Sequence, residues 1–245
     1  MYSSGLQLRC VQSKIVKNLS ANIIGTADEV VVGLNWTAVV GPLGVGLAQT
    51  PARDNSGCSS LPLSGSYTGR NLAELSTLTA SENVFEQAIG FAAINAHHNR
   101  FDLKGNNTNG LDLIKNEGEQ TVVIGQFPGL RRRVPKAIVI EREPRPGCLP
   151  ESAASYHLPN AKYVLITASA LINGTLTNLL EFTTGAYVML VGPSATLSLL
   201  MFEHGIDAIS GFIAHNSEAL LRIVMEGGTV SAMRPHGRFL TLEQQ

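Results

Sequence analysis

The second half of the chain repeats one pattern: a short, apolar, β-forming run followed by a helical or turn-forming stretch. Continuous apolar strands that alternate with helices indicate a mostly parallel sheet that is covered on both faces. This pattern constrains the fold more than any other feature, because ligands bind beyond the carboxyl ends of parallel strands. We expect strands over 121–125, 136–141, 163–167, 187–191 and 206–213, and helices over 151–158, 174–182, 196–203 and 217–226.

The first half has a different organisation. Residues 30–32 and 36–40 are rich in β-forming residues, Gly41-Pro42-Leu43-Gly44 forms a turn, and 45–50 returns as a strand. A long polar loop over 51–70 follows, and loops of that length in compact domains are often functional. Two helices come next, a short one over 71–78 and one that opens with the capping-box sequence Thr79-Ala80-Ser81-Glu82 and ends near His97-His98. Residues 102–119 are polar and form a linker or a single helical turn.

Composition excludes several classes of protein. The chain has 245 residues, is 44% hydrophobic and carries a formal net charge of −1, so no strong field favours nucleic acid. The apolar runs are far shorter than the roughly 18 residues of a membrane helix, and the first 20 residues lack a signal-peptide core, so we expect a cytoplasmic protein without membrane insertion. The three cysteines include no CxxC pair, and the histidines show no metal-binding spacing, so no metal signature stands out.

Two candidate site residues follow the first two expected strands. Gly125 begins the turn Gly125–Gly129, where the glycines serve either a tight turn or the close approach of a ligand. This turn is not a G-x-G-x-x-G motif, and the next strand follows too soon for a dinucleotide-binding helix. Glu141 can accept hydrogen bonds from a ribose diol, ligate a metal, or pair with Arg142 or Arg145 at the surface.

Hydroxyl and amide side chains follow the third and fourth expected strands, where helices are expected to begin. Free backbone N–H groups at a helix start favour a phosphate or carboxylate, whereas plain N-capping by Asn173, Thr175 or Ser194 needs no ligand. The candidates at these two strand ends are Thr167, Asn173, Thr175, Gly192, Pro193 and Ser194.

Several stretches of the chain resemble a known family pair. The C-terminal half resembles the DUF364 family, which is named for heavy-metal chelation, and the N-terminal half resembles the DUF4213 domain that precedes it. The N-terminal resemblance lies in GLAQT (46–50) and ENVFEQAIGFAAINA (82–96). The C-terminal resemblance lies in VVIGQFPGL (122–130), IVIERE (138–143), LITASALINGTLTNLLE (165–181), VMLVGPSATL (188–197) and GIDAISGFI (205–213).

The resemblance implies an α/β protein with two domains. Residues 1–115 would form an α+β domain like the N-terminal domain of enolase, and 116–245 a Rossmann-like domain with a mostly parallel sheet. It places a site in the cleft between them, completed by a second subunit of a homodimer, and adds Asn95 to the strand-end candidates. The chain departs from the family pattern at Gln126, where a histidine often stands, which weakens a metal ligand at that strand. It departs again at Ala195-Thr196, where a proline often follows the loop.

Three functions fit these observations. The leading hypothesis is a protein that binds a metal or a metal-chelating small molecule between its domains. Glu141 and Cys58 are the candidate ligands of a divalent or heavy metal, the cofactor itself being unidentified. The alternative is an enzyme acting on a nucleotide-like or pterin-like anion in the same cleft, although no nucleophile and base stand at a fixed spacing. The third is a non-catalytic partner of another protein, since Rossmann-like domains host many functions.

Overall fold

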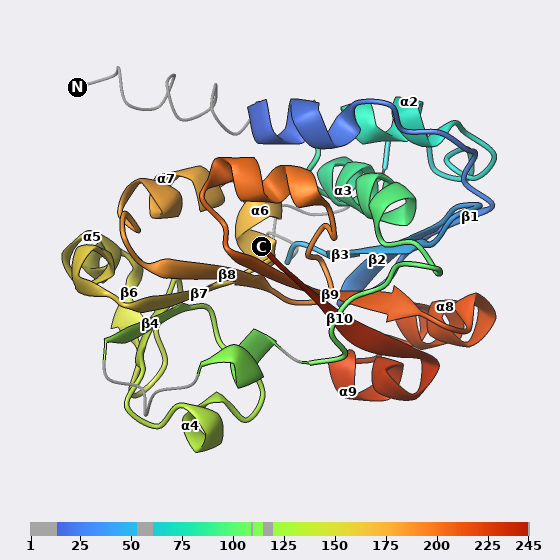
Figure 1. Cartoon of the computed structure of the whole chain (residues 1–245). Helices are drawn as coiled ribbons and strands as arrows, with labels where there is room; N and C mark the ends of the chain where they lie inside the picture. Colours follow the sequence, from blue (N-terminus) through green and yellow to red (C-terminus); the bar gives the residue numbers. More distant parts are fainter. Residues whose placement is uncertain (1–13, 53–60, 109, 115–119, 245) are drawn as a thin grey trace.

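The structure is a computed structural model that describes residues 14–52, 61–108, 110–114 and 120–244. Within these ranges the chain forms a three-stranded sheet and a seven-stranded sheet, with helices packed around both (Figure 1). This confirms the expected mixed α/β fold with a small antiparallel sheet and a larger, mostly parallel one. Among the described residues, no helix combines the length and the apolar character that crossing a membrane requires.

The small sheet is an antiparallel meander, as the sequence predicts. Val39 and Ala48 belong to the core on one face of this sheet, whereas Ala38 and Leu47 belong to a second core on the other face. The alternation follows from the two-residue period of a strand and shows that the sheet is buried on both faces. Its strands are β1 (Glu29–Val32), β2 (Trp36–Val40) and β3 (Val45–Gln49).

The helices after the small sheet are α2 (Leu72–Ser76), a 3₁₀ turn over Thr77–Ala80, and α3 (Val84–His98). The expected capping box is wrong, because the residue that caps α3 is Asn83. Its side-chain oxygen accepts hydrogen bonds from the backbone N–H groups of the second and third helical residues. An asparagine is as good a cap as serine or threonine, so the helix begins four residues later than predicted.

Glycine allows α3 to lie directly on the small sheet. A Cβ atom at Gly46 of β3 would overlap the backbone of Ala92 and Ala96 in α3. The opposite face of the sheet is covered by α8 (Ser217–Met225), which contacts β1 and β2 and comes from the far end of the chain. The first half of the sequence therefore completes its core with a helix from the second half.

The large sheet has the strand order β10-β9-β8-β7-β4-β5-β6, with every neighbouring pair parallel except β9 and β10. The antiparallel edge strand β10 was not predicted, because a single strand after the last helix does not continue the alternating pattern. The strands are β4 (Thr121–Ile124), β5 (Ile138–Glu141), β6 (Leu149–Pro150), β7 (Tyr163–Thr167), β8 (Tyr187–Val191), β9 (Ala208–Ala214) and β10 (Gly237–Glu243).

Most connections between the strands of the large sheet contain short helices. The helix expected over 196–203 is instead a 3₁₀ helix, η5 (Leu199–His204), and a short helix before α7 was not predicted. The remaining helices are η2 (Gly110–Leu113), α4 (Leu130–Arg133), η3 (Glu151–Ala153), α5 (Ala154–His157), η4 (Leu158–Asn160), α6 (Ser169–Ile172), α7 (Leu176–Glu181), α9 (Val230–Met233) and η6 (Arg234–His236).

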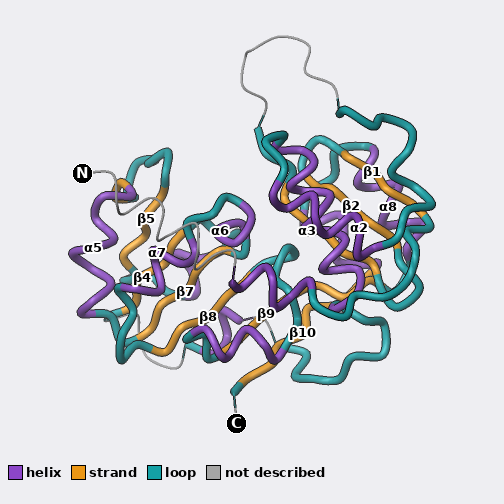
Figure 2. Tube along the Cα trace, turned by 90° about the horizontal axis from the view of Figure 1, so that it is seen from above, coloured by secondary structure: helices purple, strands orange, loops and turns teal. Residues whose placement is uncertain are grey.

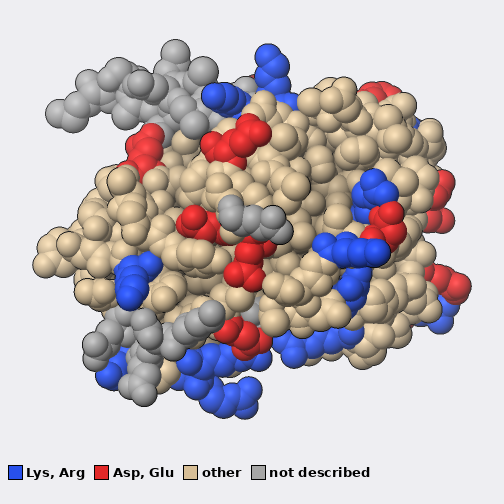
Figure 3. Space-filling model, viewed as in Figure 1, with Lys and Arg blue, Asp and Glu red and all other residues tan. Residues whose placement is uncertain are grey.

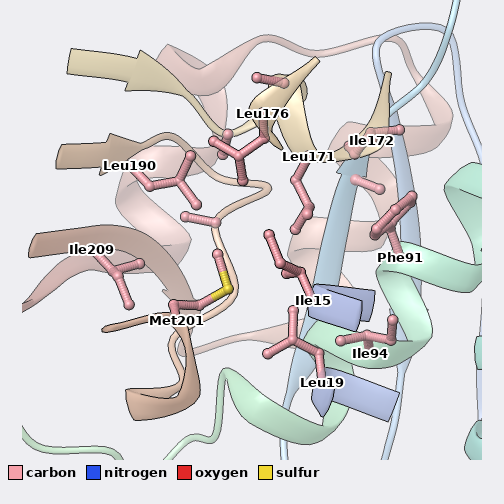
Figure 4. Packing of buried hydrophobic residues seen from close by; sticks show 14 of the residues in the cluster. Ile15, Leu19, Phe91, Ile94, Leu171, Ile172, Leu176, Leu190, Met201 and Ile209 are labelled. Atoms are coloured by element: carbon pink, nitrogen blue, oxygen red, sulfur yellow. The ribbon is translucent and has the colours of Figure 1, made fainter. Parts of the chain in front are cut away.

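One hydrophobic core joins the two halves of the chain. Residues 14–20 are helical and insert Ile15 and Leu19 between α3 and the helices that cover the large sheet (Figure 4). The same cluster includes Phe91 of α3, Leu171 of α6 and Ile209 of β9. Each Å² of apolar surface that is buried stabilises the fold by about 25 cal/mol, so this shared core holds the two halves together strongly.

Candidate functional site

A pocket lies at the carboxyl ends of three neighbouring strands, β4, β5 and β7. Its cavity volume is about 90 Å³. The helices α5, α6 and α7 lie alongside these strands (Figure 2). The pocket is lined by apolar side chains and by several polar ones, the usual character of a small-molecule site. It is lined by Ile124, Gly125, Ile140, Glu141, Arg142, Glu151, Ala154, Thr167, Ser169, Ala170, Asn173, Thr175 and Leu179.

Five of the sequence-predicted residues line this pocket: Gly125, Glu141, Thr167, Asn173 and Thr175. The pocket opens where the order of the sheet reverses, since the chain runs from β4 to β5 and β6 on one side and then returns to β7 on the other. Open parallel sheets bind ligands outside the strand ends at this reversal point.

The backbone after β4 approaches β7 closely enough to require glycine. Gly125 has φ +99°, and a Cβ atom there would lie 2.7 Å from Cγ2 and 2.8 Å from Cβ of Thr167. Its N–H donates to the carbonyl of Ile140 at 2.9 Å, which ties the turn to the end of β5. The Thr167 hydroxyl is 3.1 Å from that of Ser169, so two hydroxyls form one polar side of the pocket.

Asn173 and Thr175 form a local turn between α6 and α7. The Asn173 Oδ1 atom accepts hydrogen bonds from the Thr175 backbone N–H at 3.1 Å and from its hydroxyl at 2.8 Å. Neither side chain caps α7, which has six residues and no side-chain cap. The local turn therefore keeps the two side chains at the pocket rim, whereas a helix this short supplies little of the dipole expected to attract an anion.

Glu141 is the half-buried carboxylate of the pocket. Burial raises the pKa of the Glu141 carboxyl above its ordinary value, because the charged form loses hydration. The Arg145 guanidinium and a hydrogen bond from the Arg142 backbone N–H act in the opposite direction, and the nearby Glu143 adds to the rise. A carboxyl with a raised pKa in a pocket is a candidate for ligand contact.

Glu151 is the second carboxylate of the pocket and was not predicted from the sequence. Glu151 follows Pro150, which pairs with Glu141 in the sheet, so strand pairing brings the two acidic residues to one pocket. Its contact with Arg142 is 3.9 Å long between exposed side chains and contributes little. Only the pairing of β5 with β6 could have revealed Glu151, and that pairing has no local sequence signal.

The arginine run Arg131-Arg132-Arg133 belongs to the short helix α4. Arg131, in α4, donates to the Ala137 and Gly147 carbonyls, and Arg133 forms a 2.7 Å ion pair with Asp112. Basic side chains gather around α4 on the face seen in Figure 3. These two arginines therefore tie α4 to the segments just before and just after β5 and to η2, which precedes β4.

Asn95 and Ser194 lie elsewhere, in the buried junction between the two halves. The Asn95 Nδ2 atom donates to the carbonyls of Leu47 at 2.8 Å and Ser194 at 3.0 Å, and its Oδ1 atom accepts from the Thr196 hydroxyl at 2.6 Å. The Ser194 hydroxyl accepts from the Gln49 N–H at 3.0 Å. Asn95 is 1% exposed and Ser194 is 4% exposed, so both side chains are used within the protein.

The expected N-cap role of Ser194 is wrong, because the next helix starts only at Leu199. The segment after β8 is instead a turn followed by irregular backbone, and a second buried asparagine fixes it. Asn99 donates to the Ala195 carbonyl at 2.9 Å and accepts from the Leu197 N–H at 2.8 Å. Gly192 and Pro193 begin this segment, and neither lines the pocket.

The sequence predicts Glu141 and Cys58 as metal ligands. Cys58 lies outside the described residues, and Glu141 lies in the pocket. Within the described parts of the chain, no three His, Cys, Asp or Glu side chains gather closely enough to hold a metal ion. These residues alone therefore do not fit a metal centre built from protein side chains.

Comparison with known proteins supports the resemblance. The DUF4213 family model, described as "Putative heavy-metal chelation", matches residues 23–98, and the DUF364 model, with the same description, matches 109–243. No curated protein matches the chain.

Two crystal structures of proteins with unknown function from the DUF364 family are similar to the chain. One, from Desulfitobacterium hafniense, is 27% identical with a TM-score of 0.82, and all of both chains is covered. The other, from Pyrococcus horikoshii, is 20% identical with a TM-score of 0.78, covers 96% of this chain and 100% of its own, and shows the fold alone. The DUF364 match spans more than half of the sequence, so the chain belongs to the DUF364 family.

Proposed function

We propose that this protein binds a metal-chelating small molecule in the pocket at the ends of β4, β5 and β7. The observation that carries the proposal is the gathering of Gly125, Glu141, Thr167, Asn173 and Thr175 around one cavity. These residues come from three strand ends and from the turn between α6 and α7. The family description, heavy-metal chelation, supplies the kind of ligand.

The organic ligand would supply most of the metal-binding atoms. Glu141 and Glu151 offer carboxylate oxygens, which suit hard cations, but two carboxylates leave a metal with few protein ligands. A chelator that brings its own donor atoms removes this need. The protein then recognises the chelator, and the metal arrives with it as cargo.

The finer fold predictions support this location. Numbered along the chain, the six parallel strands have the order 3-2-1-4-5-6, which is that of a Rossmann-like sheet. The meander followed by α2 and α3 fits a domain like the N-terminal domain of enolase over 1–115, with the Rossmann-like domain over 116–245. The helix α6, which lines the pocket, contacts β3 and α3, so we place the ligand beside the boundary between these domains.

The first experiment tests whether the pocket holds a ligand and a metal. The full-length chain, purified without a metal-affinity tag, is examined by native mass spectrometry and by elemental analysis, before and after dialysis against Ni²⁺, Co²⁺ and Zn²⁺. We expect a non-covalent organic adduct and a matching metal content. Both should fall at least fivefold in Glu141→Gln and persist in Glu143→Gln, which removes the same charge outside the pocket lining.

Two results would overturn the proposal. One is a wild-type protein with neither adduct nor metal under all three dialysis conditions. The other is an adduct that Glu141→Gln leaves unchanged, because the ligand would then bind away from this carboxylate. The homodimer and the cytoplasmic location stay predictions of the sequence, and light scattering of the same preparation checks the first of them.

A further inference from the structure

We propose that the pocket recognises the vicinal diol of an uncharged ligand, a ribonucleoside or a catechol, through the Glu141 carboxylate. The inference rests on the proposed function, since it names the group by which the same pocket would hold its ligand; the atoms of that ligand that bind a metal would be other ones than the hydroxyls held by Glu141. It differs from the anionic substrate that the sequence suggested, because the pocket favours a diol and disfavours a phosphate.

The position of Glu141 in the sheet favours contact with a ligand hydroxyl. Glu141 ends β5, the strand next to β4, and Gly125 follows β4 in the facing turn. In dinucleotide-binding sheets of this strand order, an acidic side chain accepts a hydrogen bond from the 2′-hydroxyl of a ribose, and Glu141 stands at the end of the second strand. The glycine after the first strand leaves room for the ligand to approach the backbone.

The carboxylate has acceptor capacity left for two hydroxyl groups. Glu141 receives a hydrogen bond from the Arg142 backbone N–H, and it forms no salt bridge within the described part of the chain. An ionised carboxylate offers about four lone-pair positions, so two adjacent hydroxyls can donate to it at once. Hydrogen bonds to a charged acceptor are about twice as strong as neutral ones.

The shape of the pocket suits a small ring. Ile124, Ile140, Ala154 and Leu179 supply apolar side chains to its lining. A cavity of about 90 Å³ is small for a dinucleotide, and ligands of that kind occupy pockets of several hundred cubic ångströms. The ring that carries the diol, a ribose or a benzene ring, would pack against these apolar side chains and direct its hydroxyls to Glu141.

The charges of the pocket disfavour a phosphate. Two carboxylates, Glu141 and Glu151, line the pocket with one guanidinium, Arg142, whose side chain is 65% exposed. The helices that follow β4 and β7 have four residues each, which is too short for the helix-start phosphate site of dinucleotide-binding folds. A phosphate would therefore meet two carboxylates and only one, largely exposed, guanidinium.

The test compares ligands that differ by one hydroxyl or one phosphate. Binding of the four ribonucleosides, their 2′-deoxy counterparts, adenosine 5′-monophosphate, catechol and phenol to the full-length chain is measured by isothermal titration calorimetry. We expect one diol to bind about tenfold more tightly than its single-hydroxyl counterpart. A ribonucleoside and catechol distinguish the two sources of the diol, and the monophosphate should bind more weakly than adenosine.

Variants separate this inference from the proposed function. Glu141→Gln should abolish the preference for the diol, whereas Glu143→Gln should retain it. Equal binding of diol and single-hydroxyl ligands overturns the inference. If no diol binds while native mass spectrometry still finds a Glu141-dependent adduct, the inference fails and the proposed function stands. If neither binding nor an adduct is found, both fail.

Discussion

Asn95 and Asn173 are the same residue type, both were predicted to contact a ligand, and the structure gives them opposite surroundings. Asn95 is 1% exposed and makes three hydrogen bonds across the junction between the two halves. Asn173 is exposed at the pocket rim, and its side chain accepts hydrogen bonds from Thr175, two residues away. A buried amide with its partners satisfied has no capacity for a ligand, whereas an exposed one keeps its N–H₂ group free to donate.

The polar side chains of the junction and those of the pocket therefore have different roles. In the junction, polar side chains replace water and fix one backbone arrangement, so a change there should cost stability. In the pocket, polar side chains stay partly solvated, so changing one of these side chains should cost binding and little stability. The following substitutions test whether stability depends on the junction and binding on the pocket.

The largest loss of stability is expected from Asn95→Ala. The change leaves the Leu47 and Ser194 carbonyls and the Thr196 hydroxyl without their partner in a dry interior. Each unsatisfied buried group costs about 1–3 kcal/mol, so the free energy of unfolding should fall by about 3 kcal/mol or more. Urea denaturation measures the fall.

Asn173→Ala is the matched control for that substitution. It removes the same amide group from an exposed turn, and it should lower the free energy of unfolding by about 1 kcal/mol or less. Equal losses in the two variants would remove the distinction between junction and pocket.

A glycine variant gives the next largest effect and measures how tightly the pocket is built. Gly125→Ala forces an L-residue into the left-handed region and pushes its Cβ against Thr167. Backbone strain alone costs about 1–3 kcal/mol. Gly185→Ala is the control, because Gly185 has φ +85° with no atom within 4 Å of the new Cβ. Thermal unfolding should show a larger loss for Gly125→Ala, and equal losses would mean that Thr167 yields freely.

The strand ends could be predicted from the sequence because parallel strands align their carboxyl ends. Gly125, Glu141 and Thr167 share one edge for this reason, and apolar runs mark each strand. Ser194 follows a strand end too, yet it is buried, because the segment after β8 lies against α3. The contacts of that segment are 96–101 residues apart in sequence, and no local pattern encodes them.

Glu151 and β10 could not be predicted either, because their positions depend on how strands pair at the edges of the sheet. Glu151 reaches the pocket through the pairing of β5 with β6, and β10 pairs with β9 after α8 and α9. Periodicity within a segment indicates whether it is helix or strand, but edge pairing depends on the whole sheet. The general place of the site was therefore predictable, and its second carboxylate was not.

The pH dependence of the free energy of unfolding tests a partly buried contact between α3 and residues 14–20, and the expected effect is smaller than those above. His98, at the end of α3, donates from Nε2 to the Leu19 carbonyl at 2.8 Å and holds the helix of residues 14–20. Burial lowers the pKa of His98, the adjacent His97 lowers it further, and the bond to Leu19 opposes both. The unfolded chain then binds more protons, so stability is complete above about pH 6.5 and falls as the pH drops below it.

His98→Gln should flatten this pH dependence between pH 7.5 and 5.5 in urea denaturation. Burial also lowers the pKa values of His97 and His204, so part of the dependence should remain. An unchanged slope in His98→Gln would mean that His98 is as easily protonated in the folded chain as in the unfolded one.

The smallest effect on stability, with the opposite sign, is expected from Glu141→Gln in the pocket. Burial raises the pKa of Glu141 in the folded chain, so the folded state binds protons more readily than the unfolded state. The ionised carboxylate therefore weakens the fold as the pH rises through its ordinary value of about 4.3 and beyond. The neutral amide removes this cost, so Glu141→Gln should raise the thermal midpoint slightly at pH 7 and leave it unchanged near pH 3.5. A gain in stability together with a loss of ligand is typical of a binding residue, because a site keeps a strained or poorly solvated group for its ligand. If Glu141→Gln instead lowered the midpoint at pH 7, the carboxylate would be holding the fold, and the pocket would resemble the junction.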